Sequence, residues 1–304
     1  TAALSSFEKA LEHLPNSARI YSTLAQINGQ LQRRDAEMEY WYKATQINPN
    51  LVNQQGYYKL AKALEQKGKI TEAIACYEQA TVGIKSAVPA FFDLGEIYQQ
   101  QGKLEQAQAV YQKALEIEPT AAKAQYKLGT IYLQQRAFAE AIACFRMTIK
   151  HDPDFSWAYR DLVKTFLLTE KWDEAISTCY AIINLVEEYP WVYSHLGNAL
   201  RAKGRLAEAA FNFQKACEQR GWDQCVAHNY FFSTDIFSHR IPLWSEQLES
   251  LKGQAINALE VGCYQGMSSC WLLDRLLTHE ASHLTCIDSQ FADKFKENII
   301  KTGA

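Results

Sequence analysis

The sequence predicts a mainly α-helical protein of stacked helical hairpins, followed by a short α/β unit. Three observations predict this fold. A leucine recurs every 34 residues in the first half of a repeat, at Leu60, Leu94, Leu128, Leu162 and Leu196. A small residue recurs with the same period in the second half, at Ala73, Ala107, Ala141, Ala175 and Ala209. After Cys217 the period is lost, and two apolar runs flank a loop that contains glycine.

The stretch from Val88 to Ala121 is the clearest repeat. In its first half, apolar residues are spaced by three, four and seven, which predicts one face of a helix: Phe91, Leu94, Gly95 and Tyr98. Gly102 ends this helix, and Pro119 ends a second helix whose inner face carries Ala107, Tyr111 and Ala114. Each repeat is therefore expected to be a hairpin of two amphipathic helices.

This pattern resembles the tetratricopeptide repeat, a helix-turn-helix unit of 34 residues. The resemblance implies an α-solenoid, in which the hairpins stack into a right-handed superhelix. Residues 1–221 would form the array, with a half repeat up to Ser17 and six repeats that begin at Ala18, Gln54, Val88, Ala122, Ser156 and Pro190. Because solenoids usually carry caps at their ends, and because the chain does not begin with Met, we expect it to be a piece of a longer protein.

Small side chains explain how the two helices of a hairpin would approach each other. Gly95, Gly129 and Gly197 leave room on the first helix, and Ala107 and its equivalents leave room on the second. Cysteines take similar packing positions, with Cys179 in the position that Tyr111 fills in its own repeat. We therefore interpret the eight cysteines as reduced packing residues, with no zinc spacing and no metal site, in a cytoplasmic protein.

Composition excludes several classes of function. The net charge of -3 gives no general attraction to nucleic acid or to an anionic membrane surface. No apolar run approaches the roughly 20 residues that a membrane-spanning helix needs. The first residues read as an amphipathic helix with internal charges rather than as a signal peptide. We therefore expect no nucleic-acid partner and no membrane partner.

The resemblance implies that the first helix of each repeat lines a concave groove. Its inward stripe would hold positions 2, 5, 9 and 12 of the repeat. An aromatic residue recurs along this stripe, at Tyr58, Phe92, Tyr126, Trp157 and Trp191. Cationic and amide residues join it, namely Lys62 early in the array and Arg160, Lys164, Asn198 and Arg201 near its C-terminal end.

We interpret this stripe as a groove for an extended peptide or protein segment. The aromatic rings would hold apolar side chains, and the basic group would hold a carboxylate or an acidic segment. It is similar to the clamp by which some tetratricopeptide domains hold C-terminal carboxylates, but the spacing does not reproduce that clamp. The alternative is that these aromatic side chains are buried against neighbouring repeats or against the C-terminal segment.

The remainder of the chain changes character. Residues 222–254 form an aromatic-rich connecting or capping segment, in which Trp244, Leu248 and Leu251 mark a short helix. Residues 255–304 contain an apolar strand expected to be buried on both faces, a glycine loop, the helical stretch after Gly266, and a second strand that ends at Asp288. This order is one βαβ unit of a parallel sheet.

Glu260, Gly262 and Gly266 resemble the first motif of class I S-adenosylmethionine-dependent methyltransferases. The resemblance implies a Rossmann-like unit that binds S-adenosylmethionine, with the glycines close to the ligand and the following helix start facing its carboxylate. Glu260 would hold the cationic end of the ligand, and Asp288 would accept hydrogen bonds from the ribose hydroxyls. A nicotinamide cofactor ranks below S-adenosylmethionine because the third glycine of the dinucleotide motif is missing. The alternative is an unrelated α/β domain with a similar first turn.

The methyltransferase fold needs roughly five more strands in a domain of well over 100 residues. The cofactor site is therefore expected to be incomplete, and no catalytic residue can be named. Two functions follow. The first is a scaffold whose groove binds a protein partner, with this chain inactive by itself and derived from a fusion of repeats and methyltransferase. The second is a methyltransferase whose repeats recruit the substrate and whose catalytic domain is truncated here.

Overall fold

The computed structural model describes residues 2–82, 88–185, 189–288 and 294–303. The chain divides into two compact units, Thr1–Asp152 and Pro153–Ala304, which we call unit 1 and unit 2 and describe separately. The predicted domain boundaries after residues 221 and 254 both fall within unit 2 and stay predictions.

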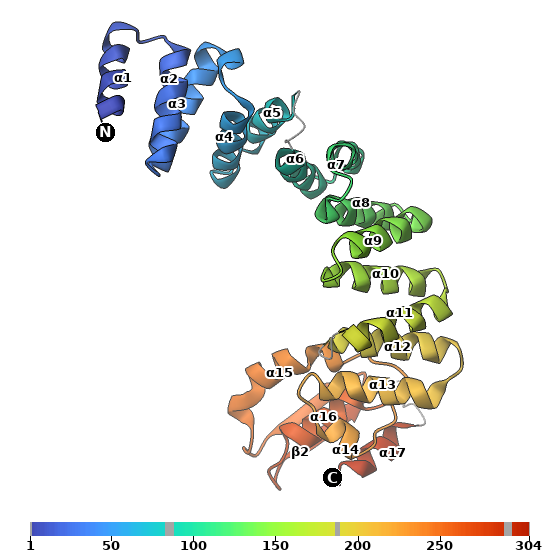
Figure 1. Ribbon diagram of the computed structural model, residues 1–304. Helices are drawn as coiled ribbons and strands as arrows, with labels where there is room; N and C mark the ends of the chain where they lie inside the picture. Colours follow the sequence, from blue (N-terminus) through green and yellow to red (C-terminus); the bar gives the residue numbers. More distant parts are fainter. Residues whose placement is uncertain (1, 83–87, 186–188, 289–293, 304) are drawn as a thin grey trace. The chain divides into compact units, whose positions relative to one another are not determined.

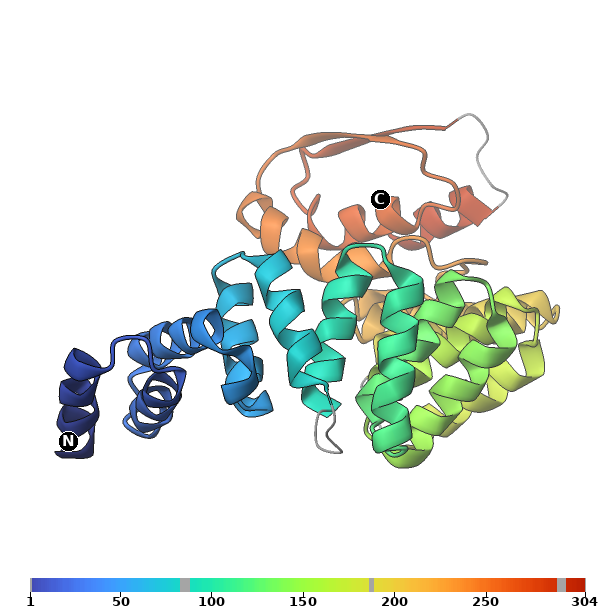
Figure 2. The ribbon, with the colours of Figure 1, turned by 90° about the horizontal axis from the view of Figure 1, so that it is seen from above.

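In its described residues, unit 1 is a single helix followed by four helical hairpins. Figures 1 and 2 draw them in colours from blue to green. The single helix α1 spans Ala2–His13 and stands where the half repeat is predicted. The hairpins are α2 with α3 (Ala18–Gln30 and Arg34–Ile47), α4 with α5 (Gln54–Gln66 and Ile70–Ala80), α6 with α7 (Val88–Gln100 and Leu104–Ile117) and α8 with α9 (Ala122–Gln134 and Phe138–His151). A short 3-10 turn, η1 (Pro49–Leu51), follows α3.

Unit 2 begins with two more hairpins and continues into a mixed segment. The hairpins are α10 with α11 (Ser156–Leu168 and Trp172–Leu185) and α12 with α13 (Pro190–Ala202 and Leu206–Glu218). Short helical pieces follow, α14 (Gln224–Ala227), η2 (Ser238–Arg240), α15 (Ile241–Leu248) and η3 (Glu249–Leu251). The chain then forms β1 (Asn257–Val261), α16 (Met267–Arg275), β2 (His283–Ile287) and α17 (Lys294–Lys301). Helical hairpins therefore begin at the six predicted repeat starts, and the strands and α16 follow the predicted order strand, helix, strand.

The hairpins pack as the small residues predict. The five periodic alanines are at most 1% exposed. A Cβ atom added to Gly95 would lie 2.6 Å from the ring of Tyr111, and one added to Gly197 would lie 2.4 Å from the ring of Phe213. Both distances are too short for a real contact, so only glycine lets the second-helix ring lie against the first helix.

The turn inside each hairpin requires one residue in the left-handed region. Gly68, Gly102 and Gly204 fill this position with φ of 73°, 72° and 75°. The other hairpins use Gln32, Arg136 and Glu170, whose φ values of 59°, 59° and 57° fall in the same region. A glycine is therefore preferred at this turn but is not required.

The sheet of unit 2 consists of two parallel strands, in a register that pairs Glu260 with Cys286. The expectation that the first strand is buried on both faces is wrong, because exposed and half-buried residues alternate along both strands. Leu259, Val261 and Ile287 lie on the exposed face, with 64%, 72% and 52% of their surface accessible. Parallel sheets usually carry helices on both faces, whereas in the described part of this chain the buried cluster that contains α16 packs on the other face of the sheet, at Ala258 and Leu284.

The connecting segment is held by a buried aromatic cluster that includes Trp222, Tyr230, Phe232 and Trp271. The Asp274 carboxylate on α16 accepts hydrogen bonds from the Trp222 indole N–H and the Tyr230 hydroxyl, each at 2.9 Å. This segment thus packs on α16 through both apolar and polar contacts.

Helix α17 was not expected from the sequence. Its Asn298 is fully buried, and its amide donates to the Phe231 and Gln265 carbonyls at 3.0 and 3.1 Å. These tertiary contacts fix the helix in unit 2.

Candidate functional sites

Three aromatic rings of the first-helix stripe in unit 1 pack within their own repeats. The rings of Tyr58, Phe92 and Tyr126 are half-buried, and each packs on the second-helix ring of its own repeat at centroid distances of 6.0, 6.0 and 5.8 Å. Burial, followed by the Asp93 carboxylate, raises the pKa of Tyr58 to about 12. Each ring is therefore partly buried, as the alternative interpretation expects. Its ring partner, however, belongs to the same repeat and not to a neighbouring one.

The charges of this stripe are paired between consecutive repeats. The Lys62 ammonium lies 3.1 Å from Asp93 on the next first helix, and Lys127 lies 2.7 Å from Glu96. Lys59 likewise pairs with Glu37, whose side chain is 7% exposed. Glu37 replaces the periodic alanine of its repeat. Gly29 leaves space for the Glu37 side chain, because a Cβ atom at Gly29 would lie 2.5 Å from the Glu37 carboxylate.

The stripe of unit 2 is more open. Trp157 on α10 is 55% exposed, and the Arg160 guanidinium lies over its ring at 4.2 Å from the centroid. Arg160 is also 3.4 Å from the Asp161 carboxylate, and Lys164 follows one turn later on the exposed side of α10. In the part of the chain that the structure describes, no ion pair forms at Lys164 or Arg201. This surface therefore carries cations beside an exposed aromatic ring.

Helix α12 contributes Trp191, Asn198 and Arg201 to the same stripe. Trp191 is half-buried and meets the His195 ring edge-on at 5.6 Å. Burial lowers the pKa of His195, and the cations Arg160, Arg220 and Lys164 lower it further, against the hydrogen bond with the Trp191 backbone, which raises it. Asn198 is half-buried, and Arg201 is exposed.

The connecting segment contacts one stripe residue of α12, Ser194. The Ser194 hydroxyl donates to the Asp235 carboxylate at 2.5 Å, and Arg220 donates to the Ser194 oxygen at 3.1 Å. Asp235 is 3% exposed and Arg220 is 12% exposed. The connecting segment thus covers part of the stripe of the last repeat, a contact that no sequence spacing indicates.

The predicted cofactor residues come together at the carboxyl ends of β1 and β2. Gly262 and Gly266 have φ of 84° and 77°, and Tyr264 between them has a φ of 45°, which is unusual for a residue with a side chain. The Tyr264 N–H donates to the Asp288 carboxylate at 2.8 Å, so Asp288 faces the loop. A Cβ at Gly262 would meet no atom within 4 Å, so the space beside this glycine is open.

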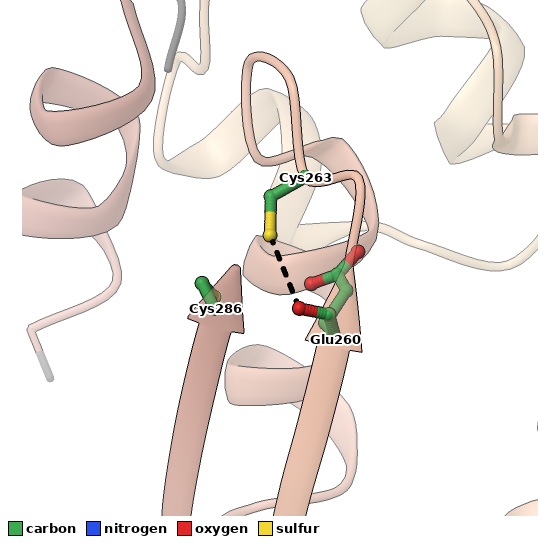
Figure 3. A group of neighbouring side chains, drawn as sticks. All are labelled: Glu260, Cys263 and Cys286. Atoms are coloured by element: carbon green, nitrogen blue, oxygen red, sulfur yellow. Dashed lines mark hydrogen bonds between the residues drawn. The ribbon is translucent and has the colours of Figure 1, made fainter. Parts of the chain in front are cut away.

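Glu260 is turned toward the start of α16. Its two carboxylate oxygens accept from the hydroxyls of Ser268 and Ser269, the second at 2.5 Å. Cys263 and Cys286 lie beside it, which the sequence did not predict because 23 residues separate the two cysteines (Figure 3). Parallel pairing of the strands is the feature that brings them together.

Models of known families match most of the hairpins. The tetratricopeptide repeat matches at residues 18–51, 54–81 and 192–220, and a second model of the same repeat matches at residues 122–155. A model described as TPR repeat matches at residues 95–136. A comparison with curated proteins finds no match.

Solved structures of low identity share the fold. The crystal structure of the MamA protein is 24% identical, covers 55% of this chain and 91% of its own, and has a TM-score of 0.51. YrrB, titled a TPR protein with an unusual peptide-binding site, is 20% identical with a TM-score of 0.50 and covers 65% of this chain and 97% of its own. The C-terminal part of a TPR repeat-containing protein from Cytophaga hutchinsonii is 16% identical with a TM-score of 0.54 and covers 72% and 88%. Among the described residues, no helix is both long and apolar enough to span a bilayer.

Proposed function

We propose that this chain, whose helical hairpins are tetratricopeptide repeats, is a scaffold that binds an extended segment of a protein partner along its first-helix stripe. The observation that carries the proposal is the exposed Trp157 ring stacked with Arg160 on α10, with Lys164 one turn further along. The similarity to YrrB, which is described as a TPR protein with an unusual peptide-binding site, supports the same function.

The chemistry of the residues favours a partner segment that carries acidic side chains. Trp and Arg are the side chains that most often dominate binding energy at protein interfaces. In unit 1 the stripe cation Lys62 and the neighbouring Lys127 are already paired with Asp93 and Glu96, so they have less to offer a ligand. On α10, Arg160 is 3.4 Å from Asp161 of its own helix, whereas Lys164 is exposed one turn later and forms no ion pair among the described residues, so Lys164 adds positive potential to this surface. A carboxylate there would form charge-assisted hydrogen bonds.

A pair of matched double variants tests this proposal. Arg160→Ala/Lys164→Ala removes two stripe cations, and Lys203→Ala/Arg205→Ala removes two exposed cations at the turn between α12 and α13. The probe is a fluorescent peptide of alternating Glu and Leu, with a matched peptide in which Lys replaces Glu, and the readout is anisotropy. We expect the stripe variant to lose on the order of 10-fold to 100-fold in affinity for the acidic peptide, and the turn variant to keep it.

Two further results decide the outcome. Trp157→Ala is expected to weaken the binding of the acidic peptide as well, because the ring contributes to the same contact. Equal binding of both peptides by the parent, or unchanged affinity in the stripe variant, would show that the stripe does not select an acidic segment. Unchanged binding in Trp157→Ala as well would remove the stripe as the binding surface.

A second function, S-adenosylmethionine binding by a methyltransferase-related unit, is favoured by the arrangement around Gly262. Open space beside Gly262 and an acid directly after β2 support this function, and Gly266 at the start of α16 is left-handed with the Phe295 ring against it. Glu260, Gly262, Gly266 and Asp288 would hold the ligand, which supplies a methyl group when bound. Since Asp288 and Glu260 already accept hydrogen bonds from the protein, these bonds would orient both carboxylates.

Calorimetry with S-adenosylmethionine tests this second function. We expect heat of binding with the parent and none with Asp288→Ala, whereas Asp173→Ala, an exposed acid on α11, serves as the control. Absence of heat with the parent would end this assignment without affecting the peptide scaffold.

A cytoplasmic location completes the proposal and is supported by the eight free cysteines. The net charge of -3 is the reason to propose neither nucleic acid nor a membrane as a partner.

A further inference from the structure

Three possible metal ligands converge at the carboxyl ends of the two strands. Glu260 comes from β1, Cys263 from the loop after it, and Cys286 from β2. One ligand atom from each of these side chains lies within 4.8 Å of the other two (Figure 3). The strand register places Glu260 directly opposite Cys286, and the turn at Gly262 brings the Cys263 sulfur back over the strand ends.

Neighbouring groups hold these side chains in place. The Ser268 and Ser269 hydroxyls donate to the two oxygens of Glu260. The Cys286 thiol donates to the Ser269 oxygen at 3.7 Å, and the Cys263 thiol donates to the Glu260 carbonyl at 3.6 Å. Hydrogen bonds of this kind orient the ligands of known metal sites and limit their motion.

We propose that Glu260, Cys263 and Cys286 form a binding site for a thiophilic divalent cation, with Zn²⁺ as the reference ion. Two sulfur ligands select such a cation over Mg²⁺ or Ca²⁺, which prefer oxygen. In a tetrahedral site with Zn–S bonds of about 2.3 Å, the ligand sulfurs lie about 3.8 Å apart. From the observed 4.8 Å limit, the two sulfurs therefore have to close by at most about 1 Å.

Three protein ligands leave a fourth position for water or for a ligand group, as in catalytic rather than structural zinc sites. Cys263 is 2% exposed, whereas Cys286 and Glu260 are half-buried, so the cation would enter from the side of the strand ends. Binding displaces the thiol protons of both cysteines, which become thiolate ligands.

Titration with Co²⁺ tests the site, because thiolate ligation gives a charge-transfer absorption in the near ultraviolet. The full chain is kept under a phosphine reductant, so that both thiols stay reduced. We expect one equivalent of Co²⁺ to produce the band and one equivalent of Zn²⁺ to abolish it. Cys263→Ser and Cys286→Ser should each weaken Co²⁺ binding at least 10-fold, and Cys76→Ser, which removes a half-buried thiol in α5, should leave the band unchanged.

The results separate this site from the other proposals. A band that persists in both Cys263→Ser and Cys286→Ser, or no band with the parent, overturns the metal site. Circular dichroism of each variant establishes that it is folded, and Cys286→Ser, at the less buried thiol, serves as the second test if Cys263→Ser does not fold. Asp288→Ala, which tests S-adenosylmethionine binding, is expected to retain the Co²⁺ band because Asp288 is outside the ligand set.

Discussion

At the scale of single residues, small side chains set the distance between the helices of a hairpin. Ala107 is fully buried in the same hairpin in which the Tyr111 ring lies against Gly95. We predict that Ala107→Leu lowers the free energy of unfolding by about 1–3 kcal/mol, because the larger side chain overpacks this contact. Ala109→Leu makes the same change at an exposed position of α7 and should stay within about 0.5 kcal/mol of the parent in urea unfolding. Equal stability of the two variants would contradict the packing.

The buried thiol of Cys179 makes the free energy of unfolding depend on pH. Burial raises the pKa of its thiol to about 12 from an ordinary value of 9.0. The folded chain therefore keeps the proton that the unfolded chain loses above pH 9, so the contribution to stability is complete below pH 9 and is lost as pH rises toward 12. We predict that the unfolding free energy falls less steeply above pH 9 in Cys179→Ala than in the parent, by up to about 1.4 kcal/mol per pH unit. Identical slopes in urea unfolding at pH 8, 9 and 10 would refute this.

Residue positions were more predictable than residue partners. The 34-residue period places Tyr58, Phe92 and Tyr126 at equivalent positions of one stripe, because a helix repeats its faces regularly. The period does not say that Lys62 pairs with Asp93 or that Asp235 covers Ser194, since these contacts join residues through tertiary packing. The same is true of Cys263 and Cys286, which only the parallel pairing of the strands brings together.

At the scale of elements, the two-stranded sheet exposes an apolar face. Because Leu259 is 64% exposed, we predict that Leu259→Thr changes the free energy of unfolding by no more than about 0.5 kcal/mol. Leu272→Ala on α16, at a side chain that is 7% exposed, should cost about 2–5 kcal/mol. Urea unfolding of both variants measures the difference. A loss of about 2 kcal/mol or more in Leu259→Thr would mean that the strand is buried on both faces, as its apolar sequence suggested.

Elements with a repeated pattern were predictable, and elements fixed by distant contacts were not. The helices of the six repeats follow from periodic apolar residues and from turn residues such as Gly102. Helix α17 is held by Asn298, whose partners Phe231 and Gln265 are more than thirty residues distant in the sequence. No local sequence pattern therefore predicts this helix. An unbroken apolar run also cannot tell whether a strand has one covered face or two, which is why β1 was misjudged.

At the scale of the whole molecule, the repeat architecture predicts that a destabilising substitution affects mainly the neighbouring repeats. In an array, each repeat contacts mainly its neighbours, so stability is approximately a sum of local terms. The buried pair of Arg220 and Asp235 joins the connecting segment to α12 through Ser194, all within unit 2. Removing one partner of a buried ion pair leaves an uncompensated charge and costs about 3–5 kcal/mol.

We therefore predict that Asp235→Ala speeds amide hydrogen exchange in α12, α13 and the connecting segment but leaves exchange in α2 to α7 of unit 1 unchanged. Mass spectrometry of peptides from the exchanged chain measures both regions in one experiment. Asp173→Ala is the matched control, because this acid is 77% exposed and its pair with Lys203 contributes little. Faster exchange throughout unit 1 would mean that the chain unfolds as one cooperative body, and unchanged exchange around α12 would mean that the buried pair does not stabilise unit 2.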